Sequence, residues 1–218
     1  MMSTYLFFMI PIASAIAFLS SLTIFFQPAA EGYLKYFSIF LFVNLLMDIA
    51  TGYTAYYHIN NLFLNNISSV LAISCELLLL RQFVHGKNAK RVILGFVLAY
   101  PVLSLINFFL VQAPSEFQSR TYAIGCLLIV PTCIYYFWEL FQQKSSVNLA
   151  RQPAFWICAG LLFYYACTFP LFGLLNSVNT LPKIIIQNLY QIFILLNVFQ
   201  YLSFTIAFLC RLKRRISM

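Results

Sequence analysis

The sequence predicts an all-α integral membrane protein, a bundle of seven transmembrane helices with its N-terminus outside and its C-terminus in the cytosol. Hydrophobic residues make up 62% of the chain and charged residues only 8%, whereas roughly 25% of an ordinary soluble domain is charged. Seven apolar segments are each long enough to cross a bilayer as a helix, which takes roughly 20 residues. When these segments are threaded across a membrane, all but two of the 13 Lys and Arg residues fall on the same side, which is the bias that marks cytosolic loops.

The predicted spans are 5–26, 33–57, 62–84, 92–112, 122–141, 154–176 and 184–210. The connections between them are short, so we expect residues 1–218 to form a single membrane domain. The first segment lacks the basic start of a signal peptide and is too long for one, so we expect it to stay as a helix; its cleavage would leave six spans. Proline inside a span should kink the helix. The prolines in question are Pro11, Pro101, Pro131 and Pro170.

Polar residues recur at helical spacing within several spans, and at 100° per residue each set falls on one face of its helix. Because an unsatisfied polar group that faces lipid is costly, these faces should point into the bundle. We therefore predict a polar pocket for a small ligand or ion between the second, third, fifth and seventh helices. The alternative is that these side chains only join helices by hydrogen bonds worth about 0.6 kcal/mol each. The candidate pocket residues are Asn44, Asp48, Thr51, Asn65, Ser69, Glu76, Tyr135, Glu139, Gln187, Gln191, Asn197 and Tyr201.

Two carboxylates lie deep within the predicted spans. At about 1.5 Å per residue, Asp48 should lie roughly 5 Å to the outer side of its helix midpoint, and Glu76 roughly 5 Å to the inner side of its own. The sequence places no Lys or Arg at either depth, so each acid should be protonated, hydrated in a cavity, or paired with a bound cation. The structural alternative is a neutral acid hydrogen-bonded to a neighbouring amide or tyrosine. Glu139 lies near the cytosolic boundary, where Lys144 or Arg151 could neutralise it.

The sequence lacks the residues that several known functions of membrane helices require. A retinal protein requires a lysine near the middle of its last helix, whereas Lys183 lies at the outer edge of that span. A membrane haem requires histidines at a common depth, but His58 and His85 lie at opposite boundaries. No histidine lies inside a span to act as a catalytic base, and the six cysteines show no metal-binding spacing, so we predict no cofactor and no metal site. An enzyme that uses Asp48 and Glu76 as a proton-transfer pair stays open as a minor hypothesis.

At 149–164 (LARQPAFWICAGLLFY), and just before it at 136–140 (YFWEL), the chain resembles a group of small bacterial seven-helix membrane proteins. The likeness extends loosely to Asn44, to Glu76 and to residues 104–107. A similar segment ends the seven-helix input regions of some bacterial sensor kinases, and this resemblance implies a signalling partner. No kinase or receiver segment is present in the sequence, so we expect the output to lie on another protein.

The sequence therefore favours a receptor-like or accessory signalling protein of the bacterial cytoplasmic (inner) membrane over an enzyme. We expect it to bind a small molecule and to act on a signalling partner in the membrane or at the cytosolic side. Its basic residues should fix orientation and contact membrane lipids, and we predict no nucleic-acid partner. Two alternatives stay open: a small-molecule or proton-coupled transporter, and a structural subunit of a membrane complex. The chain lacks the paired broken helices of many transporters, and its small-residue motifs are sparse.

Overall fold

The computed structural model describes residues 6–26, 32–110, 117–142, 148–175 and 182–216. This part of the chain is helical and contains no β-strand. A short 3₁₀ helix, Thr23–Phe26, follows the first α-helix, and another, Leu149–Arg151, precedes the sixth. The α-helices are α1 (Leu6–Leu22), α2 (Gly32–Tyr56), α3 (Leu62–Phe83), α4 (Lys87–Leu110), α5 (Ser119–Phe141), α6 (Pro153–Leu175) and α7 (Lys183–Ile216).

Seven of the described helices are long and apolar enough to cross a membrane, which confirms the predicted all-α, seven-span architecture. Their outer faces carry many large apolar side chains that are exposed, such as Leu98, Phe109 and Leu195. Soluble monomers rarely expose apolar surface that extends over so many elements. The protein is therefore an integral membrane protein.

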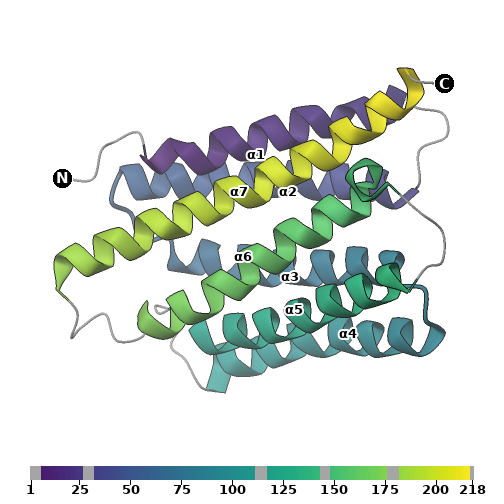
Figure 1. Ribbon diagram of the computed structural model, residues 1–218. Helices are drawn as coiled ribbons and strands as arrows, with labels where there is room; N and C mark the ends of the chain where they lie inside the picture. The colour runs from purple at the N-terminus through teal and green to yellow at the C-terminus, as the bar shows by residue number, and fades with distance from the viewer. Residues whose placement is uncertain (1–5, 27–31, 111–116, 143–147, 176–181, 217–218) are drawn as a thin grey trace.

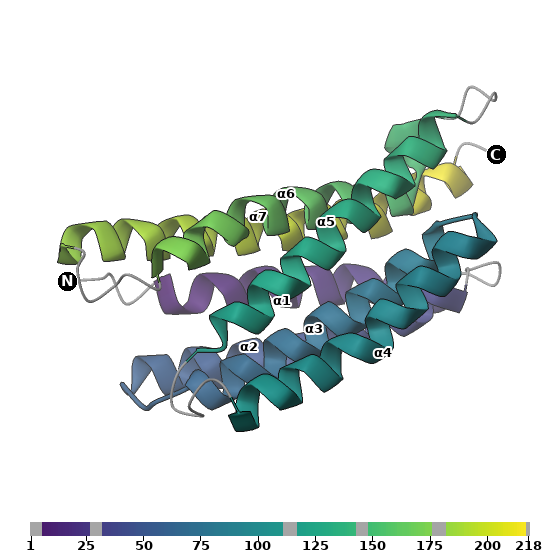
Figure 2. The same ribbon diagram turned by 90° about the horizontal axis from the view of Figure 1, so that it is seen from below.

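The helices form a closed ring in which α1 packs on α2, α2 on α3, α3 on α5, α5 on α6, α6 on α7, and α7 back on α1. The fourth helix lies outside this ring, against α3 and α5 (Figures 1 and 2). Because the number of crossings is odd, α1 begins at one end of the bundle and α7 ends at the other (Figure 1). We call these the α1-start end and the α7-stop end.

Two helices extend further than the apolar segments from which they were predicted. The fourth begins at Lys87 rather than near Val92, and the seventh continues to Ile216 rather than ending near Cys210. Both additions are rich in Lys and Arg, residues that form helix readily but do not enter the hydrocarbon core, so hydropathy alone does not detect them. Pro153 opens α6, and the four prolines named above lie inside continuous helices.

Close packing of α6 on α7 aligns the residues that matter for the site. Gly160 of α6 faces Ser203 of α7 so closely that a Cβ on Gly160 would lie 2.7 Å from the Ser203 Cβ. The two helices can approach this closely only because Gly160 has no side chain, as at other small-residue contacts of membrane helices. One turn further along α6, Tyr164 and Tyr165 are buried close to the part of α7 that carries Gln200 and Tyr201.

Candidate functional site

A cavity of about 800 Å³ lies inside the helix ring, chiefly between α2, α3, α6 and α7. Its lining begins at the α2–α3 connection, His58 to Leu62, and at Gln187 near the start of α7, so it lies towards the α1-start end. It extends inward as far as Glu76 and Phe204. Pro11 contributes a wall from α1. The volume lies within the range of sites that hold small molecules, roughly 300–1,000 Å³.

Asp48 joins α2 to α7 across this cavity. The Tyr201 hydroxyl donates a hydrogen bond of 2.6 Å to Asp48 Oδ2. This distance is typical of a hydroxyl that donates to a carboxylate. Tyr201 is itself buried, whereas the Asp48 side chain is only partly buried and lines the cavity.

Glu76 joins α3 to both α6 and α7. The Tyr165 hydroxyl donates to its Oε2 at 2.6 Å, and the Gln200 amide donates to its Oε1 at 3.1 Å. All three side chains are buried. Each carboxylate oxygen of Glu76 therefore has a neutral donor, as a buried carboxyl group requires, while the residue still borders the cavity.

Aromatic rings form much of the remaining wall. Phe172 of α6 stacks on Phe117 with ring centroids 4.9 Å apart, and its ring lies 4.3 Å from that of Tyr122. Phe193 of α7 meets Phe172 edge to face at 5.6 Å and also lies near the Tyr164 ring, at 6.4 Å. The cavity thus has a carboxylate region, formed by Asp48 and Glu76, and an aromatic region, formed by these five rings.

The structure brings most of the predicted pocket residues to this one cavity. Besides the two acids, they are Asn44, Thr51, Asn65, Ser69, Gln187, Asn197 and Tyr201. Several satisfy their polar groups within their own helix: Thr51, Ser69 and Asn197 donate to backbone carbonyl oxygens at 3.2, 2.9 and 2.8 Å. These bonds stay within one helix, whereas the Asn197 side chain also interacts with Tyr164 of α6 and so joins two helices.

Three predicted residues are not among those that line this cavity: Gln191 of α7, and Tyr135 and Glu139 of α5. Tyr135 and Glu139 lie near the end of α5, at the α7-stop end, because the polar face of that helix continues past the membrane midpoint. Gln191 lies on α7 but is exposed. Helical spacing shows which face of a helix a residue lies on but not its depth in the membrane, so the sequence grouped these residues with those of the cavity.

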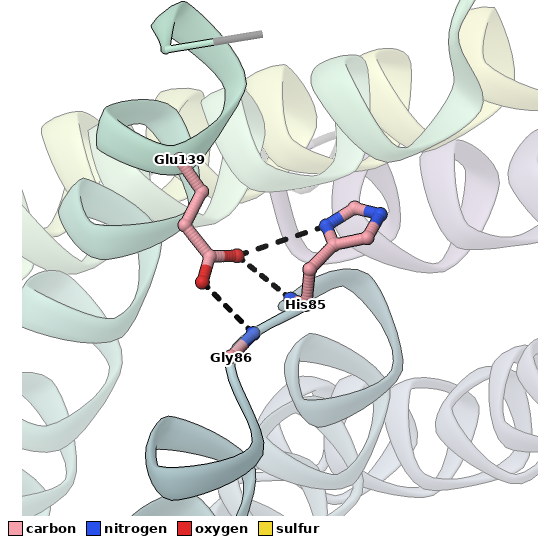
Figure 3. Close-up of polar contacts among 3 residues, drawn as sticks. All are labelled: His85, Gly86 and Glu139. Carbon is pink, nitrogen blue, oxygen red and sulfur yellow. Dashed lines mark hydrogen bonds and ion pairs between the residues drawn. The ribbon is translucent and has the colours of Figure 1, made fainter.

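Glu139 instead binds the turn between α3 and α4 (Figure 3). Its Oε2 accepts the backbone N–H of His85 at 2.7 Å, and its Oε1 accepts that of Gly86 at 3.0 Å. The His85 ring is more distant, with Nδ1 3.7 Å from Oε2, and its side chain is 73% exposed. These two N–H groups belong to the residues directly before α4, so Glu139 supplies from α5 the contact that the Glu of a capping box makes with the N-cap N–H. The sequence suggested Arg151 or Lys144 as a partner for Glu139. Among the described residues Glu139 forms no ion pair with Arg151, and Lys144 lies outside the described residues.

Sequence reasoning missed Tyr165 and Gln200, which hold Glu76, and the aromatic wall. Gln200 lies three residues after Asn197 and about 60° from it around the helix, outside the face that carries the predicted α7 residues. Tyr165, Phe172 and Phe193 sit in strongly apolar spans, and Phe117 precedes α5, so only the fold shows which rings face inward. Within the described part of the chain, no three His, Cys, Asp or Glu side chains converge in a way that could hold a metal ion.

Comparison with known proteins finds no matching family model, no similar curated protein and no similar solved structure.

Proposed function

We propose that this chain is a receptor-like or accessory signalling protein that binds a small molecule in the cavity between α2, α3, α6 and α7. One observation carries the proposal. Two acidic side chains, Asp48 and Glu76, border a single cavity of about 800 Å³ inside a membrane-spanning bundle. Ionisable residues at such positions are costly to bury and commonly mark ligand or ion sites.

The proposed orientation places the α1-start end outside and the α7-stop end in the cytosol of a bacterial inner membrane. Arg81 and Arg151 lie at the α7-stop end, as does the first turn of α4 with Lys87, Lys90 and Arg91. The side chain of Arg120 lies at the opposite end, at the start of α5. Basic residues near helix ends favour the cytosolic side. In this orientation the mouth of the cavity, near the α2–α3 connection, is open to molecules from outside.

The third helix offers a physical link from the cavity to the proposed cytosolic end. It carries Glu76 in the cavity lining and ends at Phe83, directly before the turn that Glu139 binds. Glu76 lies seven residues before the end of α3 at Phe83, about 10 Å at the helical rise of about 1.5 Å per residue. A ligand that changes the hydrogen bonds of Glu76 would bias the position of α3 and so the surface around this turn. A partner protein that contacts this surface would receive the signal.

Native mass spectrometry of the protein extracted gently from its own membrane tests the ligand part of the proposal. The variants are Asp48→Asn and Glu76→Gln, with Glu139→Gln as the matched control, because it neutralises a carboxylate outside the cavity. We expect a defined non-lipid mass on the wild type and on Glu139→Gln that is lost or reduced in both cavity variants. A bare protein in every sample, or a mass that all variants retain equally, would contradict the proposal.

Site-specific photo-crosslinking tests the signalling part. A photoreactive residue replaces Lys87 at the proposed cytosolic end, and the control carries it at Arg120, which is equally exposed at the other end. We expect one protein to be crosslinked from position 87 only, with a yield that changes when Asp48→Asn is added. Crosslinks that do not respond to the cavity substitution would remove the signalling role, and Asp48-dependent substrate flux in proteoliposomes would identify a transporter instead.

A further inference from the structure

We infer that the occupant of the cavity is a small organic cation, an amine or quaternary ammonium whose apolar part contacts the aromatic region. This inference rests on the proposed ligand-binding function and names the class of molecule that the cavity suits. It rests on three observations: the acids and their partners, the composition of the wall, and the size of the space.

Among the described residues, the hydrogen-bond partners of the two acids at the cavity are neutral. Tyr201 donates to Asp48, and Tyr165 and Gln200 donate to Glu76. No lysine or arginine is among the described residues that line the cavity. Neutral donors stabilise a carboxylate but do not cancel its charge, and a buried carboxylate without a counter-charge is costly. A ligand with a positive charge would supply that counter-charge, whereas an anion would be repelled.

The aromatic region favours an organic cation over a metal ion as the ligand. Rings from α5, α6 and α7, including Tyr122, Phe172 and Phe193, face the same space as the carboxylates. The faces of aromatic rings attract ammonium groups, and their apolar surface takes up the hydrocarbon part of an amine. A Ca²⁺ or Mg²⁺ ion would instead need six or more oxygen ligands close together. The acids Asp48 and Glu76 are held by different neighbours, and no cluster of three potential ligands is present among the described residues.

The size of the cavity agrees with this class of ligand. At about 800 Å³ it exceeds the space that a hydrated proton or a single ion occupies, and it matches sites for small organic molecules. The polar side chains at its mouth, Asn65, Ser69 and Gln187, leave the entrance wettable towards the α1-start end. The cavity therefore offers a hydrated entrance, a charged region and an aromatic region along one path.

Three probes of nearly equal size test the charge requirement: 2-phenylethylamine, which is cationic at neutral pH, 2-phenylethanol, which is neutral, and phenylacetate, which is anionic. Binding to the detergent-purified full chain is measured by isothermal titration calorimetry and by the shift in thermal unfolding temperature. We expect saturable binding of the amine alone. In the double variant Asp48→Asn with Glu76→Gln, its affinity should fall at least about tenfold, which corresponds to about 1.4 kcal/mol. Glu139→Gln is the control and should bind the amine as the wild type does.

Phe193→Leu tests the aromatic part separately, because it keeps an apolar side chain of similar volume and removes only the ring. We expect it to weaken the amine by several-fold while leaving the unfolding temperature of the free protein nearly unchanged. Equal binding of all three probes, or amine binding that survives the double variant, would overturn the inference. The two proposals fail in different ways. Cavity-dependent binding of the alcohol or the acid alone would refute the cationic ligand but support the proposed ligand-binding cavity. A wild-type protein that binds none of the probes and carries no native mass would refute both.

Discussion

Gln200 and Tyr201 are consecutive residues of α7, yet each donates a hydrogen bond to a different membrane carboxylate. Gln200 reaches Glu76 on α3 and Tyr201 reaches Asp48 on α2. Neighbouring residues on a helix point about 100° apart, so one turn of α7 contacts two separate helices. A small rotation of α7 would therefore alter both bonds together.

Removing the Tyr201 hydroxyl should weaken the bundle by a modest and measurable amount. The bond to Asp48 is short, at 2.6 Å, but double-mutant cycles in a membrane protein give about 0.6 kcal/mol on average and at most about 1.7 kcal/mol per pair. We expect a coupling free energy in this range from a cycle of Tyr201→Phe and Asp48→Ala, measured by unfolding in mixed micelles. Tyr53→Phe is the control: its residue is exposed on α2, so loss of that hydroxyl should have almost no effect. A coupling free energy of zero would mean that the two side chains act independently.

Glu139 should matter for stability, whereas the His85 ring should not. The carboxylate accepts two backbone N–H groups of the α3–α4 turn, and these groups stay in place when the His85 side chain is removed. We expect Glu139→Ala to cost about 0.5–2 kcal/mol, the range found for loss of a side-chain cap at the start of a helix, and His85→Ala less than about 0.5 kcal/mol. The measurement is the free energy of unfolding, with hydrogen exchange at Gly86 as a local readout. Equal losses for the two variants would show that the 3.7 Å ion pair, and not the backbone contact, is what stabilises the turn.

Gly160 should tolerate no side chain. An added Cβ would lie 2.7 Å from the Ser203 Cβ, an atom fixed to the α7 backbone, so the two helices would have to separate. Overpacking of this kind typically costs about 1–3 kcal/mol, and we expect Gly160→Ala to lie in that range.

Two further variants make the Gly160 experiment interpretable. Gly95→Ala on α4 is the matched control, because nothing lies within 4 Å of a Cβ at that position, and it should be neutral or slightly stabilising. Ser203→Gly should restore part of the stability lost in Gly160→Ala, since it removes the clashing atom. If Gly160→Ala proves as harmless as Gly95→Ala, the spacing of α6 and α7 is not set by this contact.

Thiol labelling tests the orientation. Asn60 is exposed in the α2–α3 connection and Gln142 is exposed directly after α5, at the opposite end of the bundle. With a membrane-impermeant maleimide, Asn60→Cys should react in intact cells and Gln142→Cys only after the cells are opened. The unsubstituted protein is the control, because its six cysteines lie within helices and three of them are buried. The reverse labelling pattern would invert the topology and place the mouth of the cavity in the cytosol.

The positions of the helices could be predicted because each depends on a local property, a run of apolar residues long enough to span lipid. The same reasoning fails where a helix leaves the hydrocarbon, as at Lys87 and Ile216, since hydropathy carries no information there. Asp48 and Glu76 could be singled out from the sequence because charge inside a span is rare. Their partners could not, because Tyr201 and Tyr165 are 153 and 89 residues away along the chain. Which helix faces which is decided by packing that only the folded ring contains.

The order of translation gives the hydrogen bonds of the two acids a further meaning. The ribosome releases α2 and α3, with Asp48 and Glu76, well before the donors that will bind them, since Gln200 follows Glu76 by 124 residues and Tyr201 follows Asp48 by 153. Asp48 therefore gains its Tyr201 donor only when the last helix is made, whereas Glu76 can already accept a hydrogen bond from Tyr165 of α6. A nascent chain halted before α7 presents two acidic groups that lack their α7 donors. The hydrogen bonds of both acids are therefore complete only when α7 has packed against α2 and α3.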